Sequence, residues 1–278
     1  MAAVSVKPAP SLKYPGAKWR CAPWIISHLP QHVTYVEPFF GSGAVFFSKP
    51  ASRVEYINDL DGDVANLFWV LRERGPELAT LIDMTPYSRA EYELSWEPCA
   101  DPLERARRIL VRHWMSIGGS GGGRSTGVWR HSGPKAARSK SCVVEWDRLP
   151  ERLSAHARRL KAAHIEQRPA LEVLGRLNHP SVLAYIDPPY HGDTRTGRMY
   201  REEMLDEAQH VELLAFLAQD WQGMAVVSGY PHPLYDEMLA GWSRATRETA
   251  AEMSQMRTEV LWLNPAATRA SLFGTVAP

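Results

Sequence analysis

Residues 183–192 read LAYIDPPYHG, and the first four form a short apolar run that stops at an acid. A buried strand of an α/β sheet has this appearance, because it is brief, apolar and bounded by a turn signal. The two prolines after Asp187 disfavour a helix at the acid and stiffen the corner that follows. We therefore expect Asp187 to project from the carboxyl end of a strand, where open α/β sheets bind their ligands.

Other segments repeat this pattern along the chain. The candidate strands are 33–37, 53–57, 182–186, 224–230 and 259–264, with helical patterns at 62–74, 100–117, 145–162 and 202–219. Strands that alternate with helices predict an α/β fold with an open, mainly parallel sheet. The stretch 69–150 departs from this alternation, since it is helix-rich and then broken by the glycine-rich segment 118–141. We interpret it as a second lobe inserted into the α/β domain.

Composition sets broad limits on the class of protein. The 278 residues, 45% of them apolar, suffice for one large core with a smaller lobe. The three cysteines lack CxxC spacing, which favours a reduced, cytoplasmic protein. We expect no secretory signal and no membrane partner, because no apolar run approaches the roughly 18 residues of a span. The histidines show no metal-ligand spacing, so no metal is expected.

The net charge of +1 hides a basic region. From Arg105 to Val144 there are nine lysines or arginines and no acid, a pattern typical of a surface that binds a polyanion. The alternative is a solvated helix face followed by a flexible loop. Aromatic residues among the cations favour contact with bases as well as phosphates. The candidate DNA-binding residues are Lys13, Arg124, Trp129, Arg130, Lys135, Arg138 and Lys140; for Lys13, a contact with DNA and no contact at all remain equally open.

A glycine turn follows the first candidate strand. In YVEPFFGSGAVFFS (35–48) the strand ends at Glu37, and Gly41 and Gly43 open a turn into a helix, where a ligand can approach the backbone. The next strand ends in NDLDGD, which places Asn58 and Asp59 about 20 residues further on, where α/β proteins bind ribose hydroxyls. Helix capping is the alternative role for Asp59. Together the two signals indicate a ligand that contains a nucleoside.

The tetrapeptide DPPY, residues 187–190, suits a flat base that carries an amino group. The carboxylate of Asp187 can only accept hydrogen bonds, and the carbonyl of Pro188 can accept another. Tyr190 offers a ring for stacking on a heterocycle. The alternative is that DPPY is only a rigid turn.

These motifs resemble those of the DNA adenine methylase (Dam) family of N6-adenine DNA methyltransferases. Matching landmarks occur in the family's order along nearly the whole chain: LKYPGAK (12–18), VEPFFGSGAVF (36–46), INDLDGDVANLF (57–68), YIDPPY (185–190) and TEVLWLNP (258–265). One departure is Tyr14, which stands where some members have tryptophan and would keep the ring contact.

The resemblance implies a Rossmann-like methyltransferase sheet that binds S-adenosylmethionine (SAM). Residues 1–68 and 151–278 would form the catalytic domain, and 69–150 a mainly helical target-recognition lobe whose hairpin, 118–141, enters double-stranded DNA. The implied activity is methyl transfer from SAM to N6 of a flipped-out adenine. The implied catalytic residues are Asp187, Pro188, Pro189 and Tyr190. The implied cofactor-binding residues are Tyr14, Lys18, Glu37, Phe39, Gly41, Ser42, Gly43, Asn58, Asp59 and Asp187.

Two other functions stay open at this point. The target could be another planar amine, such as cytosine N4, an RNA base or a glutamine side chain, although DPPY rather than SPPY or NPPY leans toward adenine. A catalytically silent DNA-binding protein is the second alternative, against which the intact motifs argue. The sequence leaves the recognition site, the biological role in a bacterium or phage, and the oligomeric state undetermined; a homodimer would suit a palindromic site.

Overall fold

The computed structural model describes residues 9–117, 128–132, 141–191, 204, 206–250 and 256–273. The chain forms two compact units, and it passes between them repeatedly. We call them the helical unit, made of Met1–Ala22, Gly41–Lys49 and Gly62–Lys161, and the sheet unit, made of Pro23–Phe40, Pro50–Asp61 and Ala162–Pro278.

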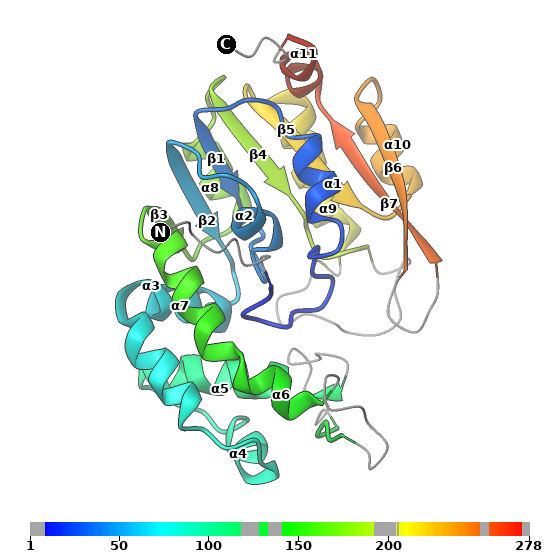
Figure 1. Cartoon of the computed structure of the whole chain (residues 1–278). Coiled ribbons are helices and arrows are strands. Elements are labelled where there is room, and N and C mark those ends of the chain that lie inside the picture. Colours follow the sequence, from blue (N-terminus) through cyan, green and yellow to red (C-terminus); the bar gives the residue numbers. More distant parts are fainter. Residues whose placement is uncertain are drawn as a thin grey trace. The chain divides into compact units, whose positions relative to one another are not determined.

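The sheet unit contains a seven-stranded sheet in the order β3-β2-β1-β4-β5-β7-β6 (Figure 1). Its strands are β1 Thr34–Glu37, β2 Val54–Asn58, β3 Ala163–Glu166, β4 Val182–Ile186, β5 Met224–Gly229, β6 Ser243–Ala250 and β7 Met256–Leu263. The pairs from β3 to β5 are parallel, and β7 is antiparallel to both β5 and β6. The predicted α/β fold with a mainly parallel sheet is confirmed.

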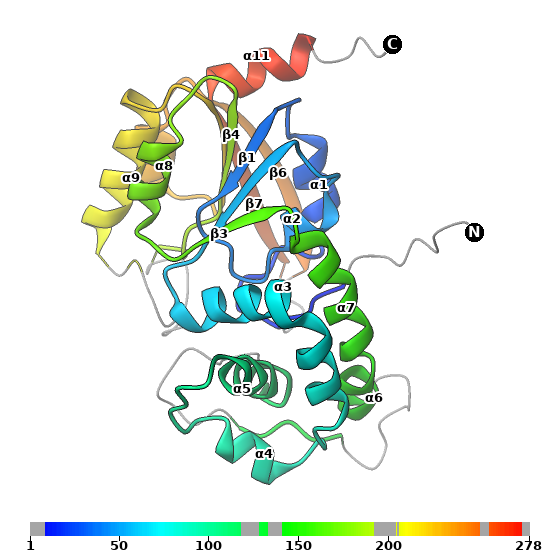
Figure 2. The ribbon, with the colours of Figure 1, turned by 90° about the vertical axis from the view of Figure 1, so that its left-hand side faces the viewer.

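One face of this sheet holds an apolar core. The helices of the unit are α1 Ala22–Ser27, α8 Ala170–Arg176, α9 Glu207–Gln219, α10 Pro233–Met238 and α11 Pro265–Phe273. Leu174 of α8, Leu214 of α9 and Tyr235 of α10 share a buried cluster with Ala184 and Val227 of the sheet. Figure 2 shows α8 and α9 on one face of the sheet and α1 on the other. Strand β4 is buried along its whole length, which explains its uninterrupted apolar sequence.

The sequence patterns located five of these strands and missed two. Strands β3 and β6 were absent from the prediction, and both lie at an edge of the sheet. An edge strand has one neighbour and more exposed side chains, so it need not be apolar. The sequence of β6, SRATRETA, shows no apolar run at all. The helical pattern at 145–162 corresponds to two helices, α6 Cys142–Asp147 and α7 Leu149–Leu160.

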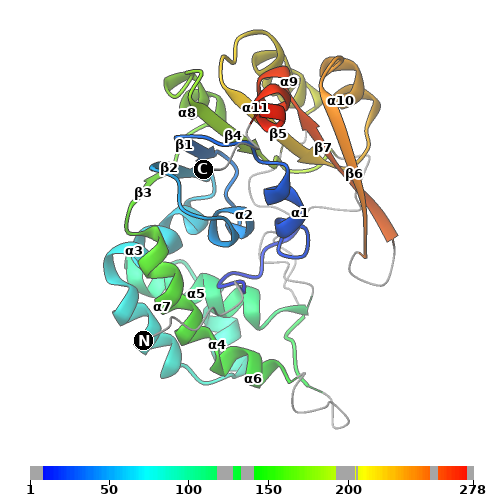
Figure 3. The same cartoon turned by 45° about the horizontal axis from the view of Figure 1, so that its top comes forward.

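The helical unit is built around a bent helix. Its helices are α2 Ala44–Ser48, α3 Gly62–Asp83, α4 Arg89–Leu94, α5 Pro102–Trp114, α6 Cys142–Asp147 and α7 Leu149–Leu160. Helix α3 packs against α5 and α7 (Figure 3). It departs from helical geometry at Arg74, just before Pro76, which cannot donate a helix hydrogen bond. A Cβ at Gly75 would lie 2.7 Å from the Cβ of Ala157, so glycine lets α3 and α7 approach closely.

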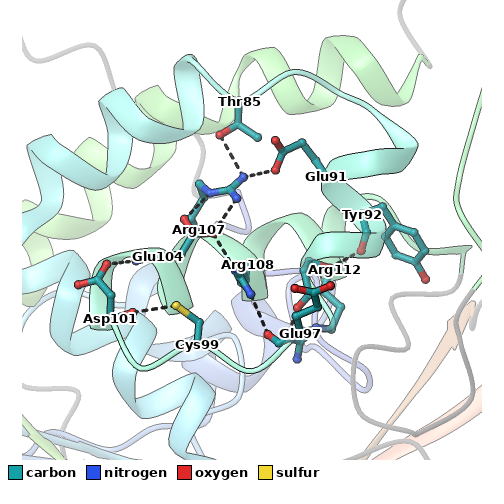
Figure 4. A network of polar contacts seen from close by, with 11 residues as sticks. Thr85, Glu91, Tyr92, Glu97, Cys99, Asp101, Glu104, Arg107, Arg108 and Arg112 are labelled. Atoms are coloured by element: carbon teal, nitrogen blue, oxygen red, sulfur yellow. Dashed lines mark hydrogen bonds and ion pairs between the residues drawn. The ribbon is translucent and has the colours of Figure 1, made fainter.

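Arginines of α5 are paired with acids from the same helix and from α4 (Figure 4). Arg107, which is 6% exposed, binds Glu104 through Nε at 2.7 Å, Glu91 through Nη1 at 2.5 Å, and the Thr85 hydroxyl at 3.4 Å. Hydrogen bonding to Glu104 raises the pKa of Arg107, so its charge is held. Arg108 shares Glu104.

Two further arginines of α5, Arg105 and Arg112, bind Asp63 of α3. The sequence predicted a purely positive surface from Arg105 onward. For α5 this prediction is wrong, because acids outside the basic stretch pair with its arginines. Within the part of the chain that the structure describes, no helix combines the length and the apolar character that a bilayer span requires.

Candidate functional site

Acids stand at the carboxyl ends of three neighbouring strands of the sheet unit. Glu37 ends β1, Asp59 follows β2 directly, and Asp187 follows β4 directly. The strand order runs β2-β1-β4, so the direction of winding reverses between β1 and β4. Ligands of open α/β sheets bind outside the carboxyl ends of the strands at such a reversal. The predicted strand-end positions of these acids are those that the structure shows.

Glu37 is a buried carboxylate, 3% exposed, at this edge. It accepts a hydrogen bond of 2.9 Å from the hydroxyl of Tyr35, a fully buried residue of the same strand. Burial, together with the nearby charge of Glu37, raises the pKa of Tyr35 well above its usual value. The hydroxyl therefore keeps its proton and orients the carboxylate. Phe39, two residues on, is partly buried against the apolar core.

Asn58 and Asp59 have different surroundings. The amide of Asn58 is 1% exposed, and its Nδ2 donates to the carbonyls of Pro38 at 2.9 Å and Arg168 at 3.0 Å. Its Oδ1 accepts from the Arg168 backbone N–H at 2.9 Å. Asp59 is partly exposed, and its Oδ1 accepts from the N–H of Asp61 at 2.9 Å, which shapes the turn before α3. Asn58 thus joins backbone segments, whereas the carboxylate of Asp59 is the more accessible of the two side chains.

The DPPY corner extends from β4, and its acid is tied to β5. Asp187 is partly exposed and Pro188 is buried, while Pro189 is partly exposed. Oδ1 of Asp187 accepts a hydrogen bond of 2.8 Å from the hydroxyl of Ser228, which is completely buried in β5. The sequence identified the β5 segment only as a strand and gave Ser228 no role.

The ring of Tyr190 is held inside the protein. Tyr190 is 6% exposed, its hydroxyl donates to Glu259 Oε1 at 3.1 Å, and its ring stacks on Tyr230 with a centroid distance of 4.3 Å. Arg257 lies 5.1 Å from the centroid of the Tyr230 ring. Glu259, 4% exposed, belongs to the TEVLWLNP landmark, which was the only sequence signal for this contact.

His191, directly after the corner, is surrounded by other histidines. Its ring centroid lies 4.2 Å from that of His232 and 5.3 Å from that of His210, and its side chain is 11% exposed. Among the described residues, no group of three or more histidines, cysteines or acids is arranged to hold a metal ion.

The cofactor residues predicted near the glycine turn lie in the helical unit. Gly41 adopts a φ of +50°, and a Cβ there would lie 3.1 Å from Cδ1 of Tyr14, so the position needs glycine on both counts. Gly43 also has a positive φ, 66°. Ser42 accepts a hydrogen bond of 3.0 Å from the indole of Trp19. Lys18 is 5% exposed, and its Nζ donates to the Gly16 carbonyl at 3.2 Å.

Two of the candidate DNA-binding cations share one acid in the helical unit. Oε2 of Glu145 lies 2.8 Å from Nζ of Lys13 and 2.9 Å from Nη1 of Arg130. Burial lowers the pKa of Lys13, and the hydrogen bond to Glu145 opposes that change. All three side chains remain between 26% and 37% exposed, so a solvent-borne anion can reach them.

A short antiparallel contact joins residues 116–117 to residues 128–129. Ser116 and Trp129 form an isolated bridge, and the N–H of Ile117 donates to the carbonyl of Val128 at 2.9 Å. The guanidinium of Arg89 lies 4.7 Å from the centroid of the Trp129 ring. The other predicted DNA-binding residues, Arg124, Lys135, Arg138 and Lys140, lie outside the described residues.

The fold and the site together define the class of protein. It is an α/β protein whose mainly parallel sheet carries a row of acids at the carboxyl ends of adjacent strands, beside a corner stiffened by two prolines. A family model described as D12 class N6 adenine-specific DNA methyltransferase matches residues 14–94 and 120–238, well over half of the chain. The chain belongs to this family, as the motifs predicted.

Individual relatives are similar over a shorter stretch. The DNA adenine methylases of Salmonella typhi and Salmonella typhimurium are each 33% identical to this chain over 106 residues. The aligned stretch spans 36% of this chain and 38% of each relative. Among solved structures, a precorrin 8w decarboxylase from Methanobacterium thermoautotrophicum aligns over 92% of this chain and 95% of its own, with 12% identity and a TM-score of 0.35. A likeness of that size carries no argument about function.

Proposed function

We propose that this chain methylates adenine at N6 in double-stranded DNA, with SAM as the methyl donor. One observation carries the proposal. In this member of the family, the DPPY corner follows β4 next to the point where the strand order reverses, and Oδ1 of Asp187 accepts a hydrogen bond from Ser228. The position suits a target amine, since a carboxylate is an obligate acceptor and an exocyclic amine is a donor.

The acids of the sheet unit fit the chemistry of SAM. SAM carries an ammonium group and ribose hydroxyls, which are hydrogen-bond donors, and Glu37 and Asp59 are acceptors at adjacent strand ends. A buried carboxylate such as Glu37 also favours a cationic ligand. We assign ribose binding to Asp59 and keep Tyr14, Lys18 and the turn Gly41–Ser42–Gly43 as proposed cofactor residues. The described contacts of Asn58 indicate that it acts indirectly, by fixing the end of β2, which Asp59 follows, to the backbone at Pro38 and Arg168.

In the proposed mechanism, residues of the DPPY corner prepare the amine. The carboxylate of Asp187 and the carbonyl of Pro188 accept the two N6 hydrogens, which favours a pyramidal nitrogen with an available lone pair. Bound SAM supplies an activated methyl group on a sulfonium sulfur. Asp187 stabilises the positive charge that develops on nitrogen, and correct placement of the reactants contributes about 7–11 kcal/mol. The proton leaves N6 after the methyl group has been transferred.

The target base must leave the duplex for this chemistry. Flipping costs a few kcal/mol in lost stacking and pairing. We propose that Tyr190 recovers part of this cost by stacking on the base, with its ring oriented by Tyr230 and Glu259. We also propose that residues 69–150 contain the target-recognition lobe and that the catalytic domain comprises 1–68 and 151–278.

Analysis of modified nucleosides tests the proposed function. The full chain is incubated with SAM and either duplex DNA or RNA, and the digested nucleosides are examined by mass spectrometry. N6-methyldeoxyadenosine is the expected product. Methylated cytosine or a methylated ribonucleoside would instead support another planar amine. SAM binding and DNA binding without any product would support the silent DNA-binding alternative.

Substitution of Asp59 is expected to weaken SAM binding. Asp59→Ala removes a charged acceptor, which is worth about 1.5–3 kcal/mol, so the Kd for SAM should rise by about 10- to 100-fold. Asp59→Asn keeps an oxygen for the Asp61 N–H and should therefore have a smaller effect. Calorimetric titration with SAM measures both. Asp220→Ala, at an exposed acid after α9, is the control; if both Asp59 variants bind like the wild type, Asp59 does not contact the cofactor.

Substitution of Arg130 is expected to weaken DNA binding in a salt-dependent way. One lost phosphate contact should reduce the slope of log K against log salt by about 1. Fluorescence anisotropy with a duplex across a salt series measures the slope for Arg130→Ala. Arg244→Ala is a matched control, because Arg244 is similarly exposed and pairs with Asp236 at 3.2 Å. An unchanged slope for Arg130→Ala would remove this residue from the interface.

A further inference from the structure

We propose that Ser228 and Tyr185 are positioning residues, which orient the carboxylate of Asp187 through a line of two buried hydroxyls. This inference deepens the proposed function and rests on it, because Asp187 is the residue that would receive the target amine. Neither hydroxyl would touch substrate, cofactor or the reacting atoms.

The three side chains come from two adjacent parallel strands. Ile186 pairs with Val227, so the next residues, Asp187 and Ser228, lie side by side where the pairing ends. Oγ of Ser228 is 2.8 Å from Oδ1 of Asp187, and the Tyr185 hydroxyl is 2.9 Å from the same Oγ. Ser228 is 0% exposed and Tyr185 is 1% exposed, so both hydroxyls must find partners inside the protein.

Counting protons gives the direction of these bonds. An ionised carboxylate only accepts, so the single hydrogen of Ser228 points to Asp187. The carbonyl of Ile186, at 3.5 Å, is the weaker competing acceptor for that hydrogen. Because Ser228 has then used its hydrogen, Tyr185 must donate in the second bond. The line therefore runs from Tyr185 to Ser228 to Asp187, and successive hydrogen bonds of this kind strengthen one another.

The consequence for Asp187 is a distinction between its two oxygens. Oδ1 is engaged by Ser228, which resists rotation of the carboxylate and so fixes the direction of Oδ2, the oxygen that we propose to face the target amine. Orientation matters here, since misplacement of a reacting group by about 1 Å can cost about 10²-fold in rate. A buried pair that only stabilises the sheet would have no such effect on chemistry.

Kinetics of single and double variants test this inference. In the full chain, Ser228→Ala is expected to slow single-turnover methyl transfer by about 10- to 100-fold, with the Kd for SAM and for the duplex within about twofold of wild type. Tyr185→Phe, which removes one oxygen atom, should slow it by about 3- to 10-fold. Because Tyr185 acts through Ser228, the double variant should be no slower than Ser228→Ala alone.

The control is Thr268→Val, which removes a partly buried hydroxyl that donates to the Asn264 carbonyl at 3.2 Å in α11 and should keep the wild-type rate. Full activity of a folded Ser228→Ala, or a Tyr185→Phe effect that adds fully to it, overturns the inference. If Ser228→Ala does not fold, Tyr185→Phe decides alone, and a wild-type rate overturns the inference. Failure of the proposed function is distinguishable, because the wild-type chain itself would then transfer no methyl group.

Discussion

Asp187→Ala is expected to reduce methyl transfer to background while SAM binding and DNA binding stay measurable. The carboxylate is the proposed acceptor for the amine and the countercharge for the developing cation. Loss of one such electrostatic contact costs about 10²- to 10³-fold in rate, and the amine also loses its placement. A tritiated-methyl transfer assay on duplex DNA measures the loss. Full turnover by Asp187→Ala would refute the role of this residue.

Asp187→Asn sharpens the same test. Ser228 donates to Oδ1 of Asp187, so the amide of the variant should turn its oxygen toward Ser228. Its NH₂ group would then take the place of Oδ2. The N–H donors of this group would face the N–H donors of the target amine, so no hydrogen bond could form between them. We expect Asp187→Asn to be about as inactive as Asp187→Ala, although the two side chains differ in size. Asp220→Ala, an exposed acid away from the strand ends, is the control and should keep the wild-type rate.

Arg107→Ala is expected to lower the free energy of unfolding by about 3–5 kcal/mol, the usual cost of breaking a buried ion pair from one side. The side chain of Arg107 is 8% exposed, and its removal takes from Glu91 and Glu104 the cation that they share, leaving Glu104 with Arg108. Hydrogen bonding to Arg107 lowers the pKa of Glu104, so the variant loses a contact that stabilises the charged form of this acid. Urea denaturation followed by circular dichroism measures the change.

A second pair of variants separates charge from packing in this network. Arg107→Met keeps the aliphatic stem, and adding Glu91→Gln should restore part of the stability because one unpaired charge disappears. Arg168→Ala is the control, since its side chain is 53% exposed and its pair with Glu172 should contribute less than about 1 kcal/mol. If Arg107→Ala costs no more than the control, the network does not stabilise the helical unit.

The sequence predicted those parts of the fold that depend on local apolar patterns. Strand β4 is apolar throughout because it is buried on both faces. It ends at Ile186, just before Asp187 and the two prolines that stiffen the corner. Strand β6 could not be recognised in this way, because an edge strand with polar side chains looks like a loop. Membership of the family followed from motifs that are short and specific.

Contacts between distant segments could not be predicted. The basic run contained no acid of its own, yet Glu91 and Asp63 neutralise arginines of α5 from outside it. Likewise, the sequence near DPPY does not indicate that the hydroxyl of Tyr190 donates a hydrogen bond to Glu259, 69 residues further along the chain. Helix packing in the helical unit and strand pairing in the sheet unit bring these residues together, and single-sequence patterns do not contain that information.

The bonds of Asn58 have a consequence for protein engineering. One side chain holds the backbone at Pro38 and at Arg168, so the segments that follow β1 and β3 keep a fixed separation from the end of β2. A library that randomises the segment around Arg168 but retains Asn58 should preserve this spacing, because the amide binds main-chain atoms and ignores side-chain identity. A library that randomises position 58 loses this spacing, whatever sequences surround that position.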